Sequence, residues 1–531
     1  TDSYNVAIGH EAGVDVTTGT QNTLIGGLAG DALTAAFENV AIGYEAQTTD
    51  TLGRRTVAVG NGALQSQNFT TATNGYNVAV GYDAGTAITT GLINTIIGAL
   101  AGDALTDADY NTAIGTSALT NDTLGSRSTA IGYSALATQN FTTATDTYNT
   151  AVGFNAGVAV TTGIQNTLIG SVAGDALTDA DFNVALGYLA LTADTLGSRS
   201  IAIGYGALQS QNFTTATNSN NVAVGFKAGE AVTTGIKNTL IGNCSGCSTT
   251  DADNNVALGL NSLLTNVLGS SSTAIGTSAL FTANPSGAAS TLNTAVGFQS
   301  GYALTTGTKN TFIGSGALTN NGAGSTITSG SGNLVLGGYN GNSGGLDIRT
   351  SNNQIVLSDG EGVPRIHVTN AGTTRMLDLN INSAASGDSD NFIRADRNSD
   401  INSGGDVRFV VFSSGNVQNS NNSYAGISDI KLKENVVDAT NKLDELNQVK
   451  IRNWNFIGET KKQIGVVAQE LELIFPGLVE TMPDTDRDGN DLGTTTKSVK
   501  YSVFVPMLIK AMQEQQTTIT ALTARITALE G

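Results

Sequence analysis

A short motif that ends in glycine recurs through the first three hundred residues of the chain at an almost fixed spacing. The tetrapeptide at Val6–Gly9 (V-A-I-G) returns as T-L-I-G, V-A-I-G and V-A-V-G, and the intervals between closing glycines run 17, 17, 17 and 21 residues before the set repeats. Eighteen closing glycines lie between Gly9 and Gly314. A repeat this strict predicts about 18 stacked coils of a parallel β-solenoid, in which each residue lies above its equivalent in the next coil.

The positions of the motif differ in chemistry. Ile or Val precedes the closing glycine in almost every coil, and a stacked column of β-branched residues suits an inward-facing strand position. The residue before that is mostly Ala, and the residue four before the glycine is mostly Asn, whose stacked amides can pair along the axis and cap turns. Coils this thin bury little by themselves, so we expect them also to pack sideways against other chains.

Charge and hydrophobicity exclude several classes of protein. Acidic residues exceed basic residues by 44 to 25, and this surplus argues against a nucleic-acid partner, which needs a basic face. No apolar run approaches the ~18 residues of a membrane span, so we expect no membrane insertion. The first residue is Thr1 and no signal peptide follows it, so we expect the chain to be a fragment or a processed piece of a longer protein.

The repeats of the form N-x-A-I-G-x-x-A, at 111–118 and in variant form at 128–135, resemble the head of trimeric autotransporter adhesins. The resemblance covers roughly residues 1–320. It implies a parallel β-roll, left-handed, in which three chains pack side by side. The 17-residue spacing is longer than that of the short coils usual in that family.

The 21-residue coils carry an extra segment, Gln67–Thr73 (Q-N-F-T-T-A-T), which recurs at 139–145 and 211–217. One interpretation is a receptor or glycan contact that is repeated along the axis for avidity. The candidate contact residues are then Gln67, Phe69, Gln139, Phe141, Gln211 and Phe213. The other interpretation is that the three phenylalanines fold back and fill the longer coil.

Residues 321–427 have lost the period. Alternating apolar stretches separated by turn residues predict short strands at 354–357, 365–368, 376–381 and 407–412. This region resembles the β-rich neck of phage tail fibres, in which strands from three chains intertwine. We therefore expect a β-rich neck between the solenoid and the C-terminal part of the chain.

The composition changes at about residue 428, where glycine falls and Lys, Glu, Leu and Val rise. We expect a helix from Ser428 to about Val449 and a strand at 451–457. Four motifs follow one another: S-D-I-K-L-K-E-N at 428–435, G-V-V-A-Q-E at 465–470, F-P-G-L-V at 475–479 and V-K-Y at 499–501. Together they closely resemble the self-cleaving intramolecular chaperone of phage tailspikes and endosialidases, which implies a small α+β chaperone domain at 428–505.

The resemblance implies that the chain cuts itself immediately before the motif serine, at Ile427–Ser428. By position, Ser428 matches the nucleophile, Lys433 the lysine of the catalytic dyad and Asp429 an acid that orients the site. A serine hydroxyl needs an adjacent base, and lysine can serve only where desolvation or nearby positive charge makes the neutral amine available. Capping of a helix N-terminus by Ser428 or Asp429 is the ordinary alternative. The implied reaction is a single-turnover proteolysis in cis without a cofactor, and we assign no activity on other substrates.

Residues 506–531 carry a heptad pattern and predict a C-terminal coiled-coil helix. Its a positions are Met512, Ile519 and Ile526, and its d positions are Leu508, Gln515, Leu522 and Leu529. Ile at a with Leu at d favours dimers in parallel coiled coils. We nevertheless expect a homotrimer, because both resemblances imply three chains.

Two further groups of residues could bind or crosslink. Asp484, Asp486 and Asp488 begin a D-x-D-x-D-G calcium loop, but Thr495 stands where the twelfth ligand should be Glu, and a solvated hairpin turn is the alternative. Cys244 and Cys247 could form a disulfide, remain free thiols, or join a metal site that takes ligands from sister chains. We favour no metal site.

The sequence therefore predicts a mainly β homotrimer with a solenoid at 1–320, a neck at 321–427, the chaperone at 428–505 and a coiled coil at 506–531. The function that we expect is a phage tail fibre, on the virion and outside the cell. It would bind a host-surface receptor or glycan and join other tail or fibre proteins through a part that precedes Thr1. The alternatives are a glycan-degrading tailspike and a bacterial surface adhesin or extracellular filament subunit, and we find no paired-carboxylate site to support glycan degradation.

Overall fold

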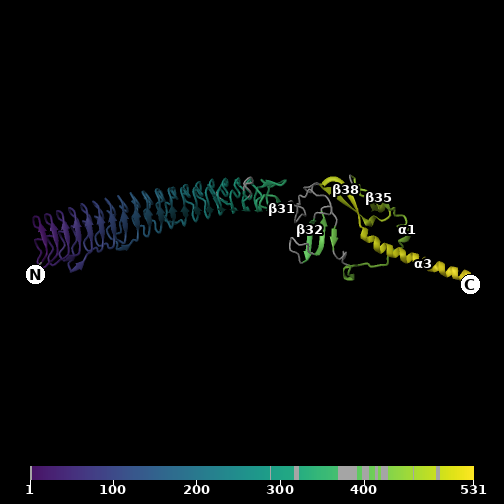
Figure 1. The fold of residues 1–531 in the computed structure, drawn as a ribbon, viewed down its shortest axis with the longest axis horizontal. Helices are drawn as coiled ribbons and strands as arrows, with labels where there is room; N and C mark the ends of the chain where they lie inside the picture. The colour runs from purple at the N-terminus through teal and green to yellow at the C-terminus, as the bar shows by residue number, and fades with distance from the viewer. Residues whose placement is uncertain are drawn as a thin grey trace. The chain divides into compact units, whose positions relative to one another are not determined.

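The computed structural model describes residues 3–287, 289–315, 322–368, 391–397, 406–412, 417–419, 428–457, 460–485 and 491–531. The chain divides into two compact units, which are essentially Thr1–Asn370 and Ile381–Gly531 (Figure 1). In the described part of the chain, no helix combines the length and the apolar character needed to cross a bilayer.

The first unit is a β-solenoid in which each coil contributes one short strand to a continuous parallel sheet (Figure 1). Equivalent residues pair directly, so that Val6 lies against Thr23 and Ile8 against Ile25. The strands are β1 (Val6–Ile8), β2 (Thr23–Ile25), β3 (Val40–Ile42), β5 (Val57–Val59), β7 (Val78–Val80), β8 (Thr95–Ile97), β9 (Thr112–Ile114), β11 (Thr129–Ile131), β13 (Thr150–Val152), β14 (Thr167–Ile169), β15 (Val184–Leu186), β17 (Ile201–Ile203), β19 (Val222–Val224), β20 (Thr239–Ile241), β21 (Val256–Leu258), β23 (Thr273–Ile275), β25 (Thr294–Val296), β26 (Thr311–Ile313), β27 (Leu334–Leu336) and β30 (Ile355–Ser358).

The sheet has 21 strands, of which the last, β31 (Pro364–Val368), is antiparallel to β30, so the parallel column has 20 coils where the sequence predicts 18. The two further coils, β27 and β30, lie beyond residue 320 in the range expected to be neck. These two coils depart from the sequence pattern. Before β27 the spacing of the stacked asparagines Asn310 and Asn333 is 23 residues instead of 17 or 21, and at the end of β30 Ser358 replaces the closing glycine. The strand expected at 376–381 lies outside the described residues.

Additional short ladders accompany the 21-residue coils. They pair β4 (Gly53–Arg54) with β6 (Thr73–Asn74), β10 (Gly125–Ser126) with β12 (Thr145–Asp146), β16 (Gly197–Ser198) with β18 (Thr217–Asn218) and β22 (Gly269–Ser270) with β24 (Ala289–Ser290), all parallel. The antiparallel pair β28 (Asn342–Ser343) and β29 (Leu346–Asp347) lies near the end of the solenoid.

From β2 onward the middle residue of each strand points into the core of its coil, together with buried residues of the turns such as Ala118 and Leu119. Ala113, Ala130 and Leu168 are fully buried, whereas Ile114 and Ile131, which precede closing glycines, are partly exposed. Successive side chains of a strand point to opposite faces, so a three-residue strand places one side chain inside and two outside. The expectation that the Ile and Val column faces inward is therefore wrong: this column lies on the outer face of the sheet.

The stacked asparagines connect neighbouring coils, as predicted. The backbone N–H of Asn22 donates to Asn5 Oδ1 at 2.8 Å, and Asn22 Nδ2 donates to the carbonyl of Ala36 at 2.9 Å in the following coil. The same arrangement recurs up the solenoid, and the side chains from Asn22 onward are buried. Each buried side-chain amide thus satisfies two backbone groups of the following coil, as Asn22 does with the carbonyl of Ala36 and the N–H of Asn39.

The closing glycines are required by backbone geometry. Gly132 has a φ of +138°, and a Cβ there would lie 2.2 Å from the carbonyl oxygen of Gly153 in the next coil. A side chain at this position would therefore force the coils apart.

A buried polar network holds the extra segment of each 21-residue coil. The Asp122 carboxylate accepts hydrogen bonds from the backbone amides of Gly125 and Phe141, both at 3.1 Å, and from Gln139 Nε2 at 2.5 Å. Gln139 Oε1 in turn accepts from Asn149 Nδ2 at 2.9 Å. Burial raises the pKa of the Asp122 carboxyl, while these hydrogen bonds oppose the shift. The same network forms around Asp50 with Gln67 and around Asp194 with Gln211.

The second unit contains an antiparallel sheet and an α+β region. The sheet orders β32 (Asn391–Arg397), β33 (Asp406–Phe412) and β34 (Val417–Asn419). The α+β region contains η1 (Ile430–Leu432), α1 (Leu443–Leu446), β35 (Arg452–Trp454), β36 (Gln463–Gly465), α2 (Ala468–Glu472), η2 (Pro476–Leu478), β37 (Val479–Thr485), β38 (Asp491–Val499), η3 (Tyr501–Val503) and α3 (Phe504–Glu530). The strands β35 and β36 pair antiparallel, as do β37 and β38.

The continuous helix expected from Ser428 to Val449 is not formed. One 3₁₀ turn ends at Lys433, whose backbone is extended, and Asn435 follows with a left-handed φ of +53°. Residues 428–441 are exposed, so no tertiary packing supports a helix there. The C-terminal helix is present as α3, which has 27 residues and begins two residues before the expected start.

The fourth 21-residue coil provides a natural test of the polar network, because Asn266 and Ala283 stand where the third coil has Asp194 and Gln211. In Asp122→Asn the new side-chain NH₂ group would face the NH₂ group of Gln139, so that two donors oppose each other. In Gln139→Ala one carboxylate oxygen of Asp122 and the Nδ2 group of Asn149 would each lose a hydrogen-bond partner. We expect each single variant to lower the free energy of unfolding by about 1–3 kcal/mol. The double variant should cost less than the sum of the single variants, with a coupling of about 0.5–3 kcal/mol in denaturant unfolding.

The matched control is the same cycle with Asp122→Asn and the distant Gln211→Ala, whose effects should add. Additive costs for the Asp122 and Gln139 pair as well would show that the two side chains do not act as one unit.

Candidate functional site

The start of the α+β region brings a hydroxyl and an amine together. Lys433 Nζ donates a hydrogen bond to Ser428 Oγ at 2.6 Å. The single 3₁₀ turn Ile430–Leu432 lies between them, and the backbone N–H of Lys433 donates to the carbonyl of Ile430. The turn thereby returns the lysine side chain toward the serine five residues before it.

Asp429 shapes this turn. Its Oδ1 accepts from the backbone N–H of Lys431 at 3.0 Å, which makes it the cap of the 3₁₀ turn, and its carboxylate lies 3.4 Å from Lys431 Nζ. The capping role weighed as an alternative is therefore present at Asp429, and it exists together with the serine–lysine contact. Asp429 thus stabilises the turn that places Lys433 beside Ser428.

The dyad is exposed to solvent in the single chain, as are all of residues 428–441. A hydrogen-bonded serine and lysine can act as nucleophile and base when the amine is neutral, and desolvation is what drives a lysine to that state. Ile427, whose carbonyl would be attacked, lies outside the described residues. The geometry thus provides the contact between nucleophile and base, but the single chain does not bury the Lys433 amine.

The remaining three motifs of this region build one small core. Val466, Leu471, Phe475 and Leu478 are buried together, and Val479, Val499 and Phe504 pack on them. Tyr501 Oη accepts a hydrogen bond from the backbone N–H of Val466 at 3.2 Å, and a Cβ at Gly465 would lie 2.6 Å from this oxygen. The glycine of one motif therefore makes room for the tyrosine of another.

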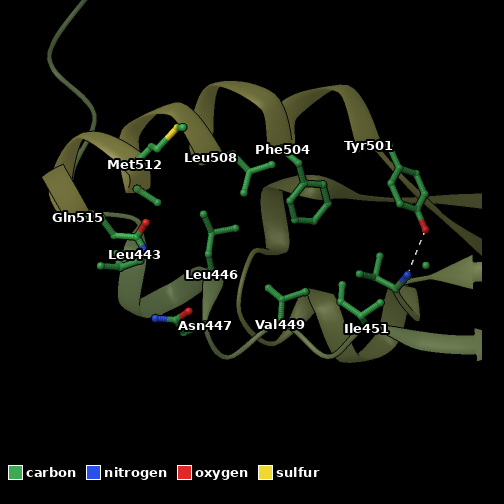
Figure 2. Close-up of a pocket in the computed structure, with 13 residues that line it drawn as sticks. Leu443, Leu446, Asn447, Val449, Ile451, Tyr501, Phe504, Leu508, Met512 and Gln515 are labelled. Carbon is green, nitrogen blue, oxygen red and sulfur yellow. Dashed lines mark hydrogen bonds between the residues drawn. The ribbon is translucent and has the colours of Figure 1, made fainter.

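A groove of about 620 Å³ opens between α1, α3 and the segment that joins α1 to β35 (Figure 2). Leu508 and Phe504 of α3 face Leu446 and Val449 across it. Glu514 links α3 to the start of α1 beside this groove. Its two carboxylate oxygens accept hydrogen bonds from the backbone amides of Lys442 and Leu443, at 2.8 and 3.1 Å. The role of Glu514 cannot be predicted from the sequence, since no local pattern signals a contact across 72 residues.

In the C-terminal half of α3 the apolar side chains are exposed to solvent. Ile519, Leu522, Ile526 and Leu529 are all exposed, at the heptad positions expected of a coiled coil. A helix with one exposed apolar stripe is stable in water only when another surface covers that stripe.

The six receptor-contact candidates are buried in the solenoid. Phe69, Phe141 and Phe213 are only 4%, 7% and 5% exposed, and Gln67, Gln139 and Gln211 are fully buried in the polar network. These residues cannot present a surface to a receptor, so their proposed role as contacts is corrected to the filler alternative. Any contact by these loops would involve exposed neighbours such as Thr70, Thr142 and Thr214.

Cys244 and Cys247 are free thiols in the structure, which corrects the disulfide alternative. Cys247 Sγ donates to the carbonyl of Lys227 at 3.0 Å, and burial raises the pKa of this thiol. Among the described residues no group of three or more His, Cys, Asp or Glu side chains could hold a metal ion.

Of the calcium-loop candidates, Asp484 lies near the end of β37, which pairs antiparallel with β38. Asp484 Oδ2 accepts from Thr494 Oγ1 at 2.7 Å, and this bond together with one from Thr496 lowers the pKa of Asp484. Asp486 and Asp488 lie outside the described residues. The antiparallel pairing on both sides of the loop agrees with the hairpin-turn alternative.

Comparison with protein families finds one match. Residues 428–480 match the family described as chaperone of endosialidase, and this range contains the dyad and the motifs at 465–470 and 475–479. Comparisons with curated proteins and with solved structures find no match. The C-terminal part of the chain is thus an endosialidase-type chaperone domain that follows a long β-solenoid.

Proposed function

We propose that this protein is a homotrimeric fibre whose chaperone domain directs assembly and then cuts itself off between Ile427 and Ser428. The observation that carries the proposal is the uncovered apolar sheet of the solenoid. The outward positions of its strands, three and one before the closing glycine, form a surface that we call the sheet face. At the second of these positions stand Ile8, Ile25, Ile42, Val59, Val80, Ile97, Ile114, Ile131, Val152, Ile169, Leu186, Ile203, Val224, Ile241, Leu258, Ile275, Val296, Ile313, Leu336 and Leu357.

Not one residue of this column is buried in the single chain, and Ile97 and Leu186 are 37% and 43% exposed. A continuous apolar stripe over 20 coils greatly exceeds the scattered hydrophobic residues of an ordinary monomer surface. Copies of the same chain are the natural cover, because they match the stripe in length and in spacing at every coil.

Three copies are favoured over two by the chaperone domain, whose relatives act as trimers. The near-identical coils explain why such a domain is needed. Three chains could align out of register by one coil or by one 72-residue superperiod and still bury most of the sheet face. A C-terminal module that trimerises through α3 sets one register before the coils close.

The cleavage chemistry follows from the contact between Ser428 and Lys433. In the proposed reaction Ser428 Oγ attacks the carbonyl carbon of Ile427 and passes its proton to neutral Lys433 Nζ. The peptide C–N bond breaks as the leaving nitrogen gains a proton, and water hydrolyses the resulting ester to free the new carboxylate of Ile427. Covering of the exposed dyad by neighbouring chains would remove water from Lys433 and so link cleavage to assembly.

Cleavage would leave the fibre without the module that set its register. The body then resists unfolding kinetically, since its strands cannot easily find their register again. A location on a phage tail and binding to a host-surface receptor or glycan complete the proposal, and they rest on analogy with proteins that carry this chaperone domain.

Lys433→Arg tests the cleavage step, because arginine keeps the charge and the length but does not become a neutral base. We expect wild-type protein to yield two fragments, 1–427 and 428–531, on denaturing gels, and Lys433→Arg and Ser428→Ala to remain intact. Lys431→Arg is the matched control and should cleave like wild type. Cleavage of Lys433→Arg at the wild-type rate would remove the lysine from the mechanism.

Ile169→Glu tests the sheet face. In a single chain the side chain is partly exposed and the glutamate stays hydrated, whereas in a trimer three carboxylates become buried together. We expect a lower yield of trimer in size-exclusion chromatography with light scattering, while Thr143→Glu, on the exposed extra segment, should assemble normally. Wild-type protein that is a monomer would contradict the proposed architecture.

A further inference from the structure

Two columns of exposed side chains flank the sheet face. The N-flank column consists of the residues five before each closing glycine, and the C-flank column consists of the residues that follow each closing glycine. The exposed aromatic members of the N-flank column are Tyr4, Tyr76, Tyr110, Tyr148 and Phe182, and those of the C-flank column are Tyr44, Tyr82, Tyr133, Phe154, Tyr188, Tyr205, Phe226 and Phe298.

Within each column, side chains of neighbouring coils contact one another at several places. In the C-flank column Tyr133 stacks on Phe154 with ring centroids 5.5 Å apart, and Tyr205 stacks on Phe226 at 5.2 Å. In the N-flank column the Arg127 guanidinium lies 4.9 Å from the ring centroid of Tyr110 and 5.8 Å from that of Tyr148. Contacts along a column order the side chains and leave much of each ring open.

The backbone of the N-flank column adopts a conformation that favours glycine, yet every member of the column carries a side chain. All eighteen residues from Tyr4 to Lys309 have a left-handed φ, for example +60° at Tyr110 and +64° at Arg127. This conformation costs a non-glycine residue of order 1 kcal/mol or more. The chain has 65 glycines and places none of them in this column, so strain is accepted eighteen times to keep a side chain there.

The two columns also differ in charge. The N-flank column has five basic residues, Arg55, Arg127, Arg199, Lys237 and Lys309, against one acid, Glu38, in a chain whose net charge is −19. The C-flank column has no acid and no Lys or Arg, and it is the richer of the two in aromatic rings. A guanidinium beside an electron-rich ring is a favourable cation–π pair.

We propose that the N-flank column of one copy packs against the C-flank column of the next copy, so that three such seams close the fibre. The inference rests on the proposed homotrimer. In a closed threefold ring every contact is head-to-tail, and the start of a strand therefore meets the end of a strand in the neighbouring copy. With the coils in register, Tyr148 meets Phe154, Phe182 meets Tyr188, and Arg127 meets Tyr133 of the next copy.

The same pairs cannot meet within one chain. Strand β13 separates Tyr148 from Phe154, and its three residues alone span about 10 Å. A disulfide requires Cα atoms within about 7 Å, so cysteines at these two positions can be linked only between copies.

The test introduces Tyr148→Cys and Phe154→Cys together into a chain whose Cys244 and Cys247 are changed to serine. After mild oxidation with oxidised glutathione we expect covalent dimers and trimers on non-reducing gels. Either substitution alone should give no covalent species, because a head-to-tail seam never brings two identical positions together. The pair Phe182→Cys with Tyr188→Cys, at another coil, should behave in the same way.

The control pair Thr143→Cys with Phe154→Cys moves one member off the flank and should remain uncrosslinked. A trimer in light scattering that gives no crosslink at either double variant would overturn the seam and leave the trimer standing. Crosslinks from a single variant would also overturn it, because they require an isologous contact. A monomer in light scattering would overturn the trimer and the seam together.

Discussion

Each coil of the solenoid depends on the coil above it for its hydrogen bonds, and this dependence governs the rest of the first unit. Strands of three residues with parallel partners 17 or 21 residues away have no stability as separate pieces. Close stacking also requires that the backbone of one coil approach that of the next at the closing glycine, where a Cβ would collide with a carbonyl. Regular spacing, obligatory glycine and buried asparagine all serve the same stacking.

The thin coil that results has room inside for one strand side chain, and this is why Ala is so frequent there. The bulkier Ile and Val are left outside on the sheet face. A chain built this way is stable along its axis and incomplete at its side, so it requires other copies. The net charge of −19 per chain keeps finished fibres apart in solution.

Much of this could be predicted from the sequence, for reasons that are local. The strand positions follow from the closing glycines, and the contact between Ser428 and Lys433 spans only five residues. β-Propensity could not predict that Ile114 and its equivalents point to the outer face of the sheet, because the buried position of each strand is taken by a small residue such as Ala113. The last two coils were missed because irregular loops stretch the period, and the Glu514 cap because nothing in the sequence near Lys442 points to it. The burial of Phe69 and Gln67 could not be predicted, because it depends on hydrogen bonds to Asp50 in the preceding coil.

The central claim is that the sheet faces of three chains meet at the axis of the fibre. Electron cryomicroscopy of the purified solenoid body measures this directly in cross-section. We predict threefold symmetry, with the strands β1 to β30 nearest the axis and the extra segments at 67–73, 139–145 and 211–217 on the outside. A cross-section that contains one chain, or three chains whose strands face the solvent, would contradict it.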